Sequence, residues 1–170
     1  AACLELDKNL QNCTSAAHQA EIEYKTGLGD VAAISSALSV GNFPLIVERK
    51  APGANGENTT YNVENKVVVC ISGLGRNTSE IISSSEWSEI INAVSSNLNI
   101  TDYDIRSVIK VGRIFTETSG LINVNLAEIL DSVPLGAVSS VAHLGTSIVA
   151  VSDNITELAS SLEKYGEIRI

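Results

Sequence analysis

The stretch Thr26-Gly27-Leu28-Gly29-Asp30-Val31 separates two segments with helical patterns and decides how the first part of the chain turns. Two glycines one residue apart permit backbone angles that other residues avoid, so we expect a sharp break here. Asp30 then stands where the N-cap of the next helix belongs. Backbone N–H groups at such a helix start would keep its carboxylate ionised and directed at whatever fills the turn. The pattern suits either a group that attracts a hydroxyl proton or an ordinary helix cap.

Helices and strands alternate along the rest of the chain. The run Val67-Val68-Val69-Cys70-Ile71 is short and continuously apolar, as in a strand buried on both faces. Strands are predicted at 43–49, 66–71, 147–151 and 167–170. Helices are predicted at 1–10, from Thr14 or Ser15 to about Tyr24, after Asp30, at 79–83, 85–98, 102–118 and 125–130, and from Asp153 or Asn154 to about Tyr165. This interleaving predicts an α+β fold, with helices packed on a mixed or antiparallel sheet.

Composition narrows the classes of protein. The 170 residues are 44% hydrophobic and 18% charged, which is typical of a folded globular chain, and the net charge is −9. An acidic chain argues against nucleic-acid partners, although a pocket can still be basic enough for one small anion. No apolar run is long enough to span a membrane. Cys3, Cys13 and Cys70 are odd in number and lack metal-site spacing, so we expect a reducing cytoplasm.

Two further segments carry side chains or backbone suited to ligands. The first is Arg49-Lys50, which precedes a Pro52-Gly53 loop; a guanidinium can hold a carboxylate through two hydrogen bonds. The second is the small-residue segment 136–147 ahead of a buried strand, where a ligand or another backbone can approach closely. Taken singly, the first also fits a solvated basic pair, and the second fits tight packing of a helix on a sheet.

The order of these pieces resembles the GHMP superfamily of small-molecule kinases. The matching strings are Ala17-His18-x-x-Glu21, Gly27-x-Gly29-Asp30-Val31-Ala32, Arg49-x-x-Pro52-Gly53-Ala54-x-Gly56 and Ala142-x-Leu144-Gly145-Thr146-Ser147. Within the superfamily they are most similar to archaeal pantoate kinases. The resemblance covers essentially the whole chain, and Thr26–Val31 is its most specific element.

The resemblance implies a fold, a reaction and a place in metabolism. It implies a C-terminal GHMP domain of ferredoxin-like type over 41–170, preceded by a remnant of the N-terminal GHMP domain over 1–40. The implied reaction is ATP-dependent phosphorylation of a small-molecule hydroxyl, most specifically of pantoate to 4-phosphopantoate in archaeal coenzyme A biosynthesis. The implied cofactors are ATP and Mg²⁺, and the implied location is the cytoplasm.

The same resemblance implies roles for individual residues. Asp30 would orient or deprotonate the attacking hydroxyl, and Arg49 would hold the carboxylate of the substrate. The remaining implied roles are substrate binding by Gly27 and Gly29, nucleotide binding by Leu144, Gly145 and Thr146, and Mg²⁺ binding by Glu21.

The chain also departs from the family pattern. Pro44-Leu45 replaces a glycine pair, His143 stands where Met is usual, and no Gly-rich phosphate loop precedes these motifs. We therefore expect this chain to be the C-terminal part of the enzyme and to be inactive alone. Its expected partners are a hydroxy acid, the missing N-terminal half and, by resemblance, a second copy. The alternatives are another GHMP kinase, of mevalonate-pathway or homoserine type, and a non-catalytic GHMP-like binding module.

Overall fold

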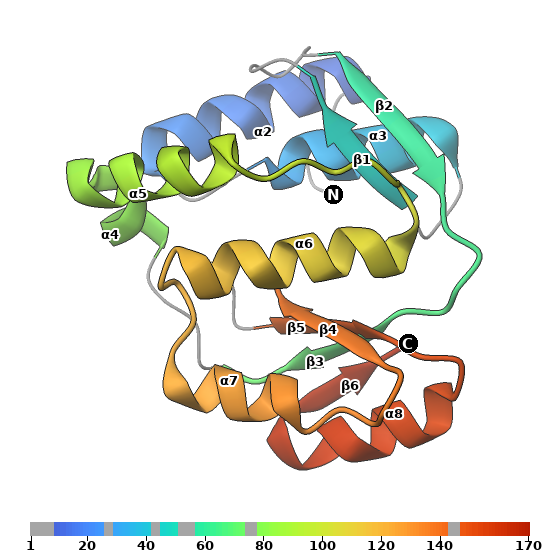
Figure 1. Cartoon of the computed structure of the whole chain (residues 1–170). Coiled ribbons are helices and arrows are strands. Elements are labelled where there is room, and N and C mark those ends of the chain that lie inside the picture. The colour runs from blue at the N-terminus through green and yellow to red at the C-terminus, as the bar shows by residue number, and fades with distance from the viewer. Residues whose placement is uncertain (1–8, 26–28, 42–44, 51–56, 74–77, 143–146) are drawn as a thin grey trace. The chain divides into compact units, whose positions relative to one another are not determined.

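A computed structural model describes residues 9–25, 29–41, 45–50, 57–73, 78–142 and 147–170. Figure 1 shows the chain coloured from its N-terminus to its C-terminus. The chain forms two compact units, Ala1–Val63 (unit 1) and Glu64–Ile170 (unit 2). Each unit is built from its own helices and strands.

In the part of unit 1 that the structure describes, there are two helices and one hairpin. Helix α2 spans Leu10–Tyr24, helix α3 spans Asp30–Val40, and strands β1 (Leu45–Arg49) and β2 (Asn58–Asn62) pair in antiparallel fashion. The expected strand at 43–49 is thus confirmed from Leu45 onward. Strand β2 was not expected, because its sequence Asn-Thr-Thr-Tyr-Asn lacks an apolar face.

Helix α2 begins earlier than the sequence predicted. Asn9 is its N-cap, and Asn9 Oδ1 accepts hydrogen bonds from the backbone N–H groups of Gln11 and Asn12 at 3.0 and 3.3 Å. The expected cap at Thr14 or Ser15 is therefore wrong. Thr14 instead lies inside the helix, where its hydroxyl donates to the carbonyl of Leu10 at 2.8 Å.

The boundary between the units differs from the division expected at residue 40. The hairpin groups with the preceding helices, because Asn58 Nδ2 donates to Ser36 Oγ on α3 at 3.1 Å and both strands pack against that helix. The compact unit therefore extends to Val63. The assignment of the two parts to N-terminal and C-terminal GHMP domains stays a prediction.

Unit 2 is an α+β unit with a four-stranded sheet. Its elements are β3 (Val68–Ile71), α4 (Thr78–Ser83), α5 (Ser85–Ser96), α6 (Ile105–Thr118), α7 (Val124–Asp131), β4 (Val138–Val141), β5 (Ser147–Val151), α8 (Ile155–Leu162), the short 3₁₀ turn η1 (Glu163–Tyr165) and β6 (Glu167–Arg169). The strand order is β4-β5-β3-β6, and each neighbouring pair is antiparallel. This βαββαβ arrangement confirms the expected α+β class with a ferredoxin-like sheet.

The main core of unit 2 lies on one face of this sheet. Val68 and Cys70 from β3 stand opposite Ala150 and Ile148 from β5, and all four side chains are fully buried. Helices α7 and α8 cover this face with the buried side chains Leu126, Ile129, Leu130, Leu158 and Leu162. Burial of such apolar side chains contributes roughly 1.5–3 kcal/mol each relative to full exposure. Most of the stability of the unit therefore resides here.

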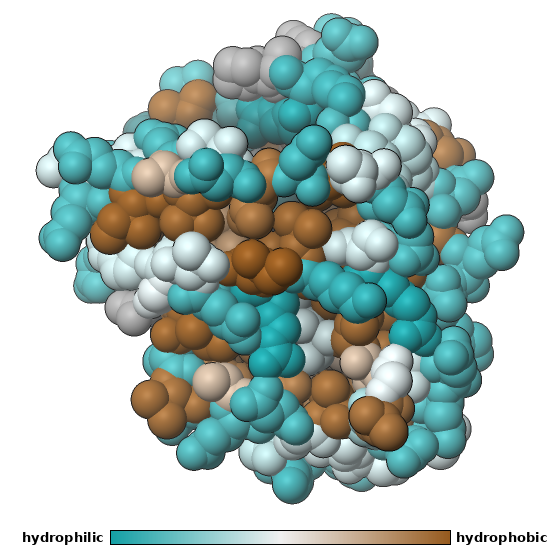
Figure 2. Space-filling model, viewed as in Figure 1, coloured by the Kyte–Doolittle hydropathy of each residue, from teal (hydrophilic) through white to brown (hydrophobic). Residues whose placement is uncertain are grey.

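Helix α6 covers the opposite face of the sheet, as Figure 1 shows. It approaches β4 closely, since a Cβ added to Gly112 would lie 3.2 Å from Ser140 Oγ. A smaller apolar cluster joins α4 and α5 to the end of α6, through the buried Ile81 and Leu121 and the half-buried Trp87 and Phe115. Helix α5 has no fully buried side chain, and Figure 2 shows apolar side chains reaching the surface over it.

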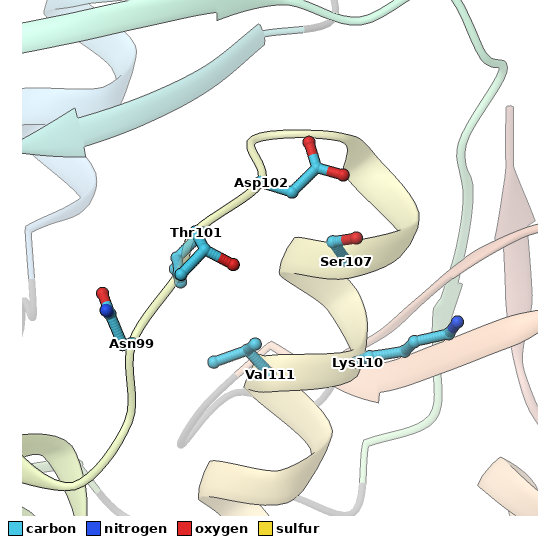
Figure 3. Close-up of a pocket in the computed structure, with 7 residues that line it drawn as sticks. Asn99, Thr101, Asp102, Ser107, Lys110 and Val111 are labelled. Carbon is cyan, nitrogen blue, oxygen red and sulfur yellow. The ribbon is translucent and has the colours of Figure 1, made fainter.

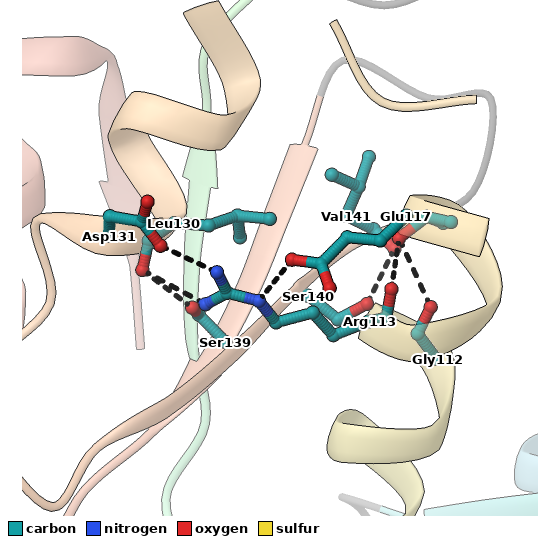
Figure 4. Close-up of polar contacts among 9 residues, drawn as sticks. Gly112, Arg113, Glu117, Leu130, Asp131, Ser139, Ser140 and Val141 are labelled. Carbon is teal, nitrogen blue, oxygen red and sulfur yellow. Dashed lines mark hydrogen bonds and ion pairs between the residues drawn. The ribbon is translucent and has the colours of Figure 1, made fainter. Parts of the chain in front are cut away.

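Arg113 ties helix α6 to helix α7 (Figure 4). Its Nη2 lies 2.5 Å from Asp131 Oδ1, its Nε lies 2.7 Å from Glu117 Oε1, and its Nη1 donates to the Leu130 carbonyl at 3.4 Å. Partial burial lowers the pKa of Arg113, but the hydrogen bonds to Asp131 and Glu117 outweigh it and raise the pKa overall. The guanidinium therefore stays charged and connects the two helices.

Among the described helices, none is both long and apolar enough to cross a membrane.

Candidate functional site

Asp30 occupies the start of helix α3. Gly29 is the N-cap, with φ of 116°, a left-handed conformation that favours glycine, and its carbonyl accepts from the N–H of Ala33 at 3.2 Å. Asp30 is therefore the first residue of the helix, and the expectation that it is itself the cap is corrected by one position. The side chain is exposed.

Arg49 lies at the same end of α3. Its Nη1 would be 3.5 Å from a Cβ added to Gly29, so the guanidinium lies against the residue that precedes Asp30. Arg49 is the last residue of β1, and the hairpin brings it back to the helix start. Folding thus brings together three predicted site residues, Gly29, Asp30 and Arg49, from two elements.

The neighbour of Arg49 is already engaged. Lys50 Nζ lies 2.5 Å from Glu48 Oε1, and Tyr61 Oη donates to Glu48 Oε2 at 3.1 Å. The hydrogen bond to Glu48 raises the pKa of Lys50, so this cation stays paired with its own strand. Of the predicted basic pair, Arg49 therefore lies against the start of α3, whereas Lys50 pairs with Glu48.

Glu21 lies near the end of helix α2. Its Oε2 is 3.5 Å from His18 Nδ1, and its side chain is only 14% exposed. The Glu21 carbonyl also accepts from the N–H of Lys25, which closes the helix with a left-handed φ of 51°. Within the described ranges, no group of three or more His, Cys, Asp or Glu side chains could hold a metal ion. Glu21 as a Mg²⁺ ligand stays a prediction.

The remaining predicted residues, Gly27, Leu144, Gly145 and Thr146, lie outside the described residues, as does His143. The flanks of the 136–147 segment are described. They form the antiparallel strands β4 and β5, and the N–H of Ala142 donates to the Ser147 carbonyl at 2.8 Å. The segment was expected to precede a buried strand, and its first part is itself a strand.

Sequence reasoning missed Asn58 and Ser36. Asn58 Nδ2 donates to Ser36 Oγ at 3.1 Å, while Asn58 Oδ1 is buried without a hydrogen-bond partner. Asn58 also stands directly opposite Arg49 in the β1–β2 ladder. No sequence signal marked this residue, because β2 itself was not expected and an isolated asparagine carries no motif.

Unit 2 contains a shallow pocket of about 240 Å³ beside helix α6. Its lining comes from one loop and one helix: Asn99, Ile100, Thr101, Asp102, Ser107, Lys110 and Val111. Figure 3 shows the Lys110 side chain directed away from the Asp102 carboxylate. Lys110 and Asp102 therefore do not face each other across the pocket. The lining contains none of the predicted site residues.

Comparison with known proteins finds similarity to a phosphotransferase of known structure and to a pantoate kinase. No protein-family model matches it. A solved structure described as a phosphotransferase related to the CoA biosynthesis pathway matches with a TM-score of 0.56 and 25% identity, over 94% of this chain and 53% of that one. The chain is also 26% identical over 162 residues to the pantoate kinase of Methanospirillum hungatei JF-1, covering 93% of this chain and 50% of the relative.

These two similarities confirm the resemblance to the C-terminal part of a GHMP-like pantoate kinase. The expected α+β class is confirmed by the helices and antiparallel sheets of this chain, and the TM-score of 0.56 indicates that the matched structure shares its fold. The chain spans about half the length of both relatives, at 50% and 53%. The roles of the individual site residues therefore stay predictions.

Proposed function

We propose that the protein containing this chain transfers the γ-phosphoryl group of ATP to the primary hydroxyl of pantoate, in coenzyme A biosynthesis. The observation that carries the proposal is the Arg49 guanidinium lying against Gly29, directly before Asp30 at the start of α3. A cation and a carboxylate at one helix start suit an acceptor with an acid group and a hydroxyl. The similarity to a pantoate kinase and to a CoA-pathway phosphotransferase supports this acceptor.

The two side chains would divide the work of holding the acceptor. Phosphoryl transfer depends mainly on positioning and on charge stabilisation rather than on covalent chemistry by the protein. The planar guanidinium of Arg49 would bind the carboxylate of the substrate through two hydrogen bonds. Asp30, exposed and in the first turn of α3, would orient the hydroxyl and attract its proton as the new O–P bond forms.

ATP and Mg²⁺ would be held only partly by this chain. We propose that Gly27 and Gly29 line the acceptor and that Leu144, Gly145 and Thr146 contact the nucleotide. Mg²⁺ in such sites is usually held by one or two carboxylates together with phosphate oxygens. Glu21 would supply one of these carboxylates once its contact with His18 is broken. The bound ion would neutralise charge on the phosphates. The companion half would supply the phosphate loop.

The proposal is tested on the full-length protein with a panel of acceptors. Pantoate, mevalonate and homoserine are compared by ADP release, and we expect pantoate to have the highest kcat/KM. Replacing Asp30 by Asn keeps the size of the side chain and removes its charge. We expect this change to lower kcat roughly a hundredfold or more, because a positioned acid–base group contributes about 10²–10⁴.

Glu23→Gln is the matched control, since Glu23 is an exposed acid on α2 and should leave kcat unchanged. Phosphorylation of mevalonate or homoserine in preference to pantoate would replace the proposed substrate. Binding of the acceptors without any turnover would favour a binding module. An unchanged rate in Asp30→Asn would show that Asp30 does not have the assigned role.

A further inference from the structure

The side-chain amide of Asn58 is only half satisfied. Its Nδ2 donates to Ser36 Oγ at 3.1 Å, but its Oδ1 is buried and lacks a partner. Leaving a buried acceptor without a hydrogen bond destabilises the folded state, and an apolar side chain of similar size would avoid this cost. The contribution of Asn58 to stability therefore does not explain an amide at this position.

The strand register places this amide beside Arg49. The N–H of Lys50 donates to the Glu57 carbonyl at 2.8 Å, so Lys50 and Glu57 form a hydrogen-bonded pair. The next pair along the ladder, Arg49 and Asn58, is then a non-hydrogen-bonded pair, in which the Cα atoms are about 4.5 Å apart and the side chains are closest. Both side chains lie on the same face of the hairpin, from which Arg49 extends to Gly29.

We infer that Asn58 is a positioning residue for Arg49: its buried Oδ1 accepts a hydrogen bond from the guanidinium when Arg49 holds the carboxylate of the acceptor. This inference rests on the proposed function. A guanidinium has five N–H donors, and a bidentate carboxylate uses only two of them. A fixed amide oxygen can orient the guanidinium of Arg49 without neutralising its charge. A carboxylate at position 58 would instead compete with the substrate carboxylate for the guanidinium. Ser36 holds the amide in the required orientation.

The change Asn58→Leu in the full-length protein removes the amide and keeps a side chain of similar size. Because a hydrogen bond to a charged group is stronger than one between neutral groups, we expect the KM for pantoate to rise at least tenfold. The KM for ATP and kcat should change less than twofold, and Tm should be unchanged or higher. Thr59→Val is the control, since Thr59 lies on the other face of β2 opposite Glu48 and should alter neither KM.

A double-mutant cycle then tests whether Asn58 acts through Arg49. In an Arg49→Ala background, Asn58→Leu should change the KM for pantoate less than twofold. An equal effect in both backgrounds, or an unchanged KM with a lower Tm, would overturn the inference. If the acceptor panel identifies another hydroxy acid, the cycle is run with that acid. Failure of pantoate as the substrate is thereby distinguished from failure of Asn58 as the positioning residue.

Discussion

The positions of Asp30 and Arg49 in secondary structure could be predicted from the sequence alone. Their types and local patterns mark a helix start and a strand end, and both expectations hold to within one residue. That the guanidinium of Arg49 lies against Gly29 is a property of the hairpin and of α3 together. Asn58 is the opposite case, because a polar residue in a polar strand gives no sign that its amide oxygen is buried.

Cys70 provides a prediction at the residue scale. Its side chain is fully buried, its Sγ donates to the Leu162 carbonyl at 3.6 Å, and burial raises the pKa of the thiol above its ordinary value of 9.0. The folded chain therefore keeps a proton that the unfolded chain releases above about pH 9. This contribution to stability is complete below that pH and is lost as the pH rises through the folded pKa.

The free energy of unfolding should thus fall more steeply from pH 9 upward in the wild type than in Cys70→Ala. The extra slope should be at most about 1.4 kcal/mol per pH unit, the value for a single proton. Urea titrations at several pH values between 7.5 and 10.5 measure it. Parallel pH profiles for the two proteins would exclude a thiol that stays protonated in the folded state.

At the scale of elements, the sequence predicts the helices better than the strands. Helices α5, α6, α7 and α8 all fall where they were expected, to within a few residues, because each has an apolar stripe and an N-terminal cap from Ser, Asp or Asn. Strands β2 and β4 were missed. Both consist mainly of small or polar residues, and each becomes a strand by pairing with an apolar neighbour, β1 or β5.

Gly166 provides a prediction about the docking of strand β6. Its φ of 169° is extended and open to any residue, but an added Cβ would overlap the carbonyl group of Ile71 on β3. Gly166→Ala should therefore push β6 away from β3 and lower the free energy of unfolding by about 1–3 kcal/mol, as overpacking does. Urea denaturation followed by circular dichroism measures this loss. Ser160→Ala, at an exposed position on α8, is the control and should change little.

The chain forms two units, and among the residues that the structure describes an extensive core is found only in unit 2. Its sheet and two covering helices bury the large apolar side chains, whereas the buried residues of unit 1 are mostly small: Cys13, Thr14, Ala32, Ala37 and Ile46. Unit 1 nevertheless holds Asp30, Gly29 and Arg49. The candidate site thus lies on the part of the chain with fewer buried apolar contacts.

At this scale we predict that the 170-residue chain alone has no kinase activity. The relatives are about twice as long, since this chain covers 50% and 53% of them, and the donors that neutralise the phosphates are proposed to come from the companion half. The measurement is ADP release from ATP and pantoate by the purified chain, beside the full-length protein. Circular dichroism checks that the purified chain is folded. Turnover by the chain alone would refute the prediction.

The sequence by itself determined the fold class, most of the helices, the central strands β3 and β5, and the resemblance to pantoate kinases. These follow from hydrophobic periodicity, caps and ordered motifs, which are local properties of the chain. Only the tertiary structure decided that β2 exists, that its Asn58 lies opposite Arg49, and that Arg49 reaches the start of α3. Strand pairing and side-chain contact join residues distant in the chain, so no local pattern contains them.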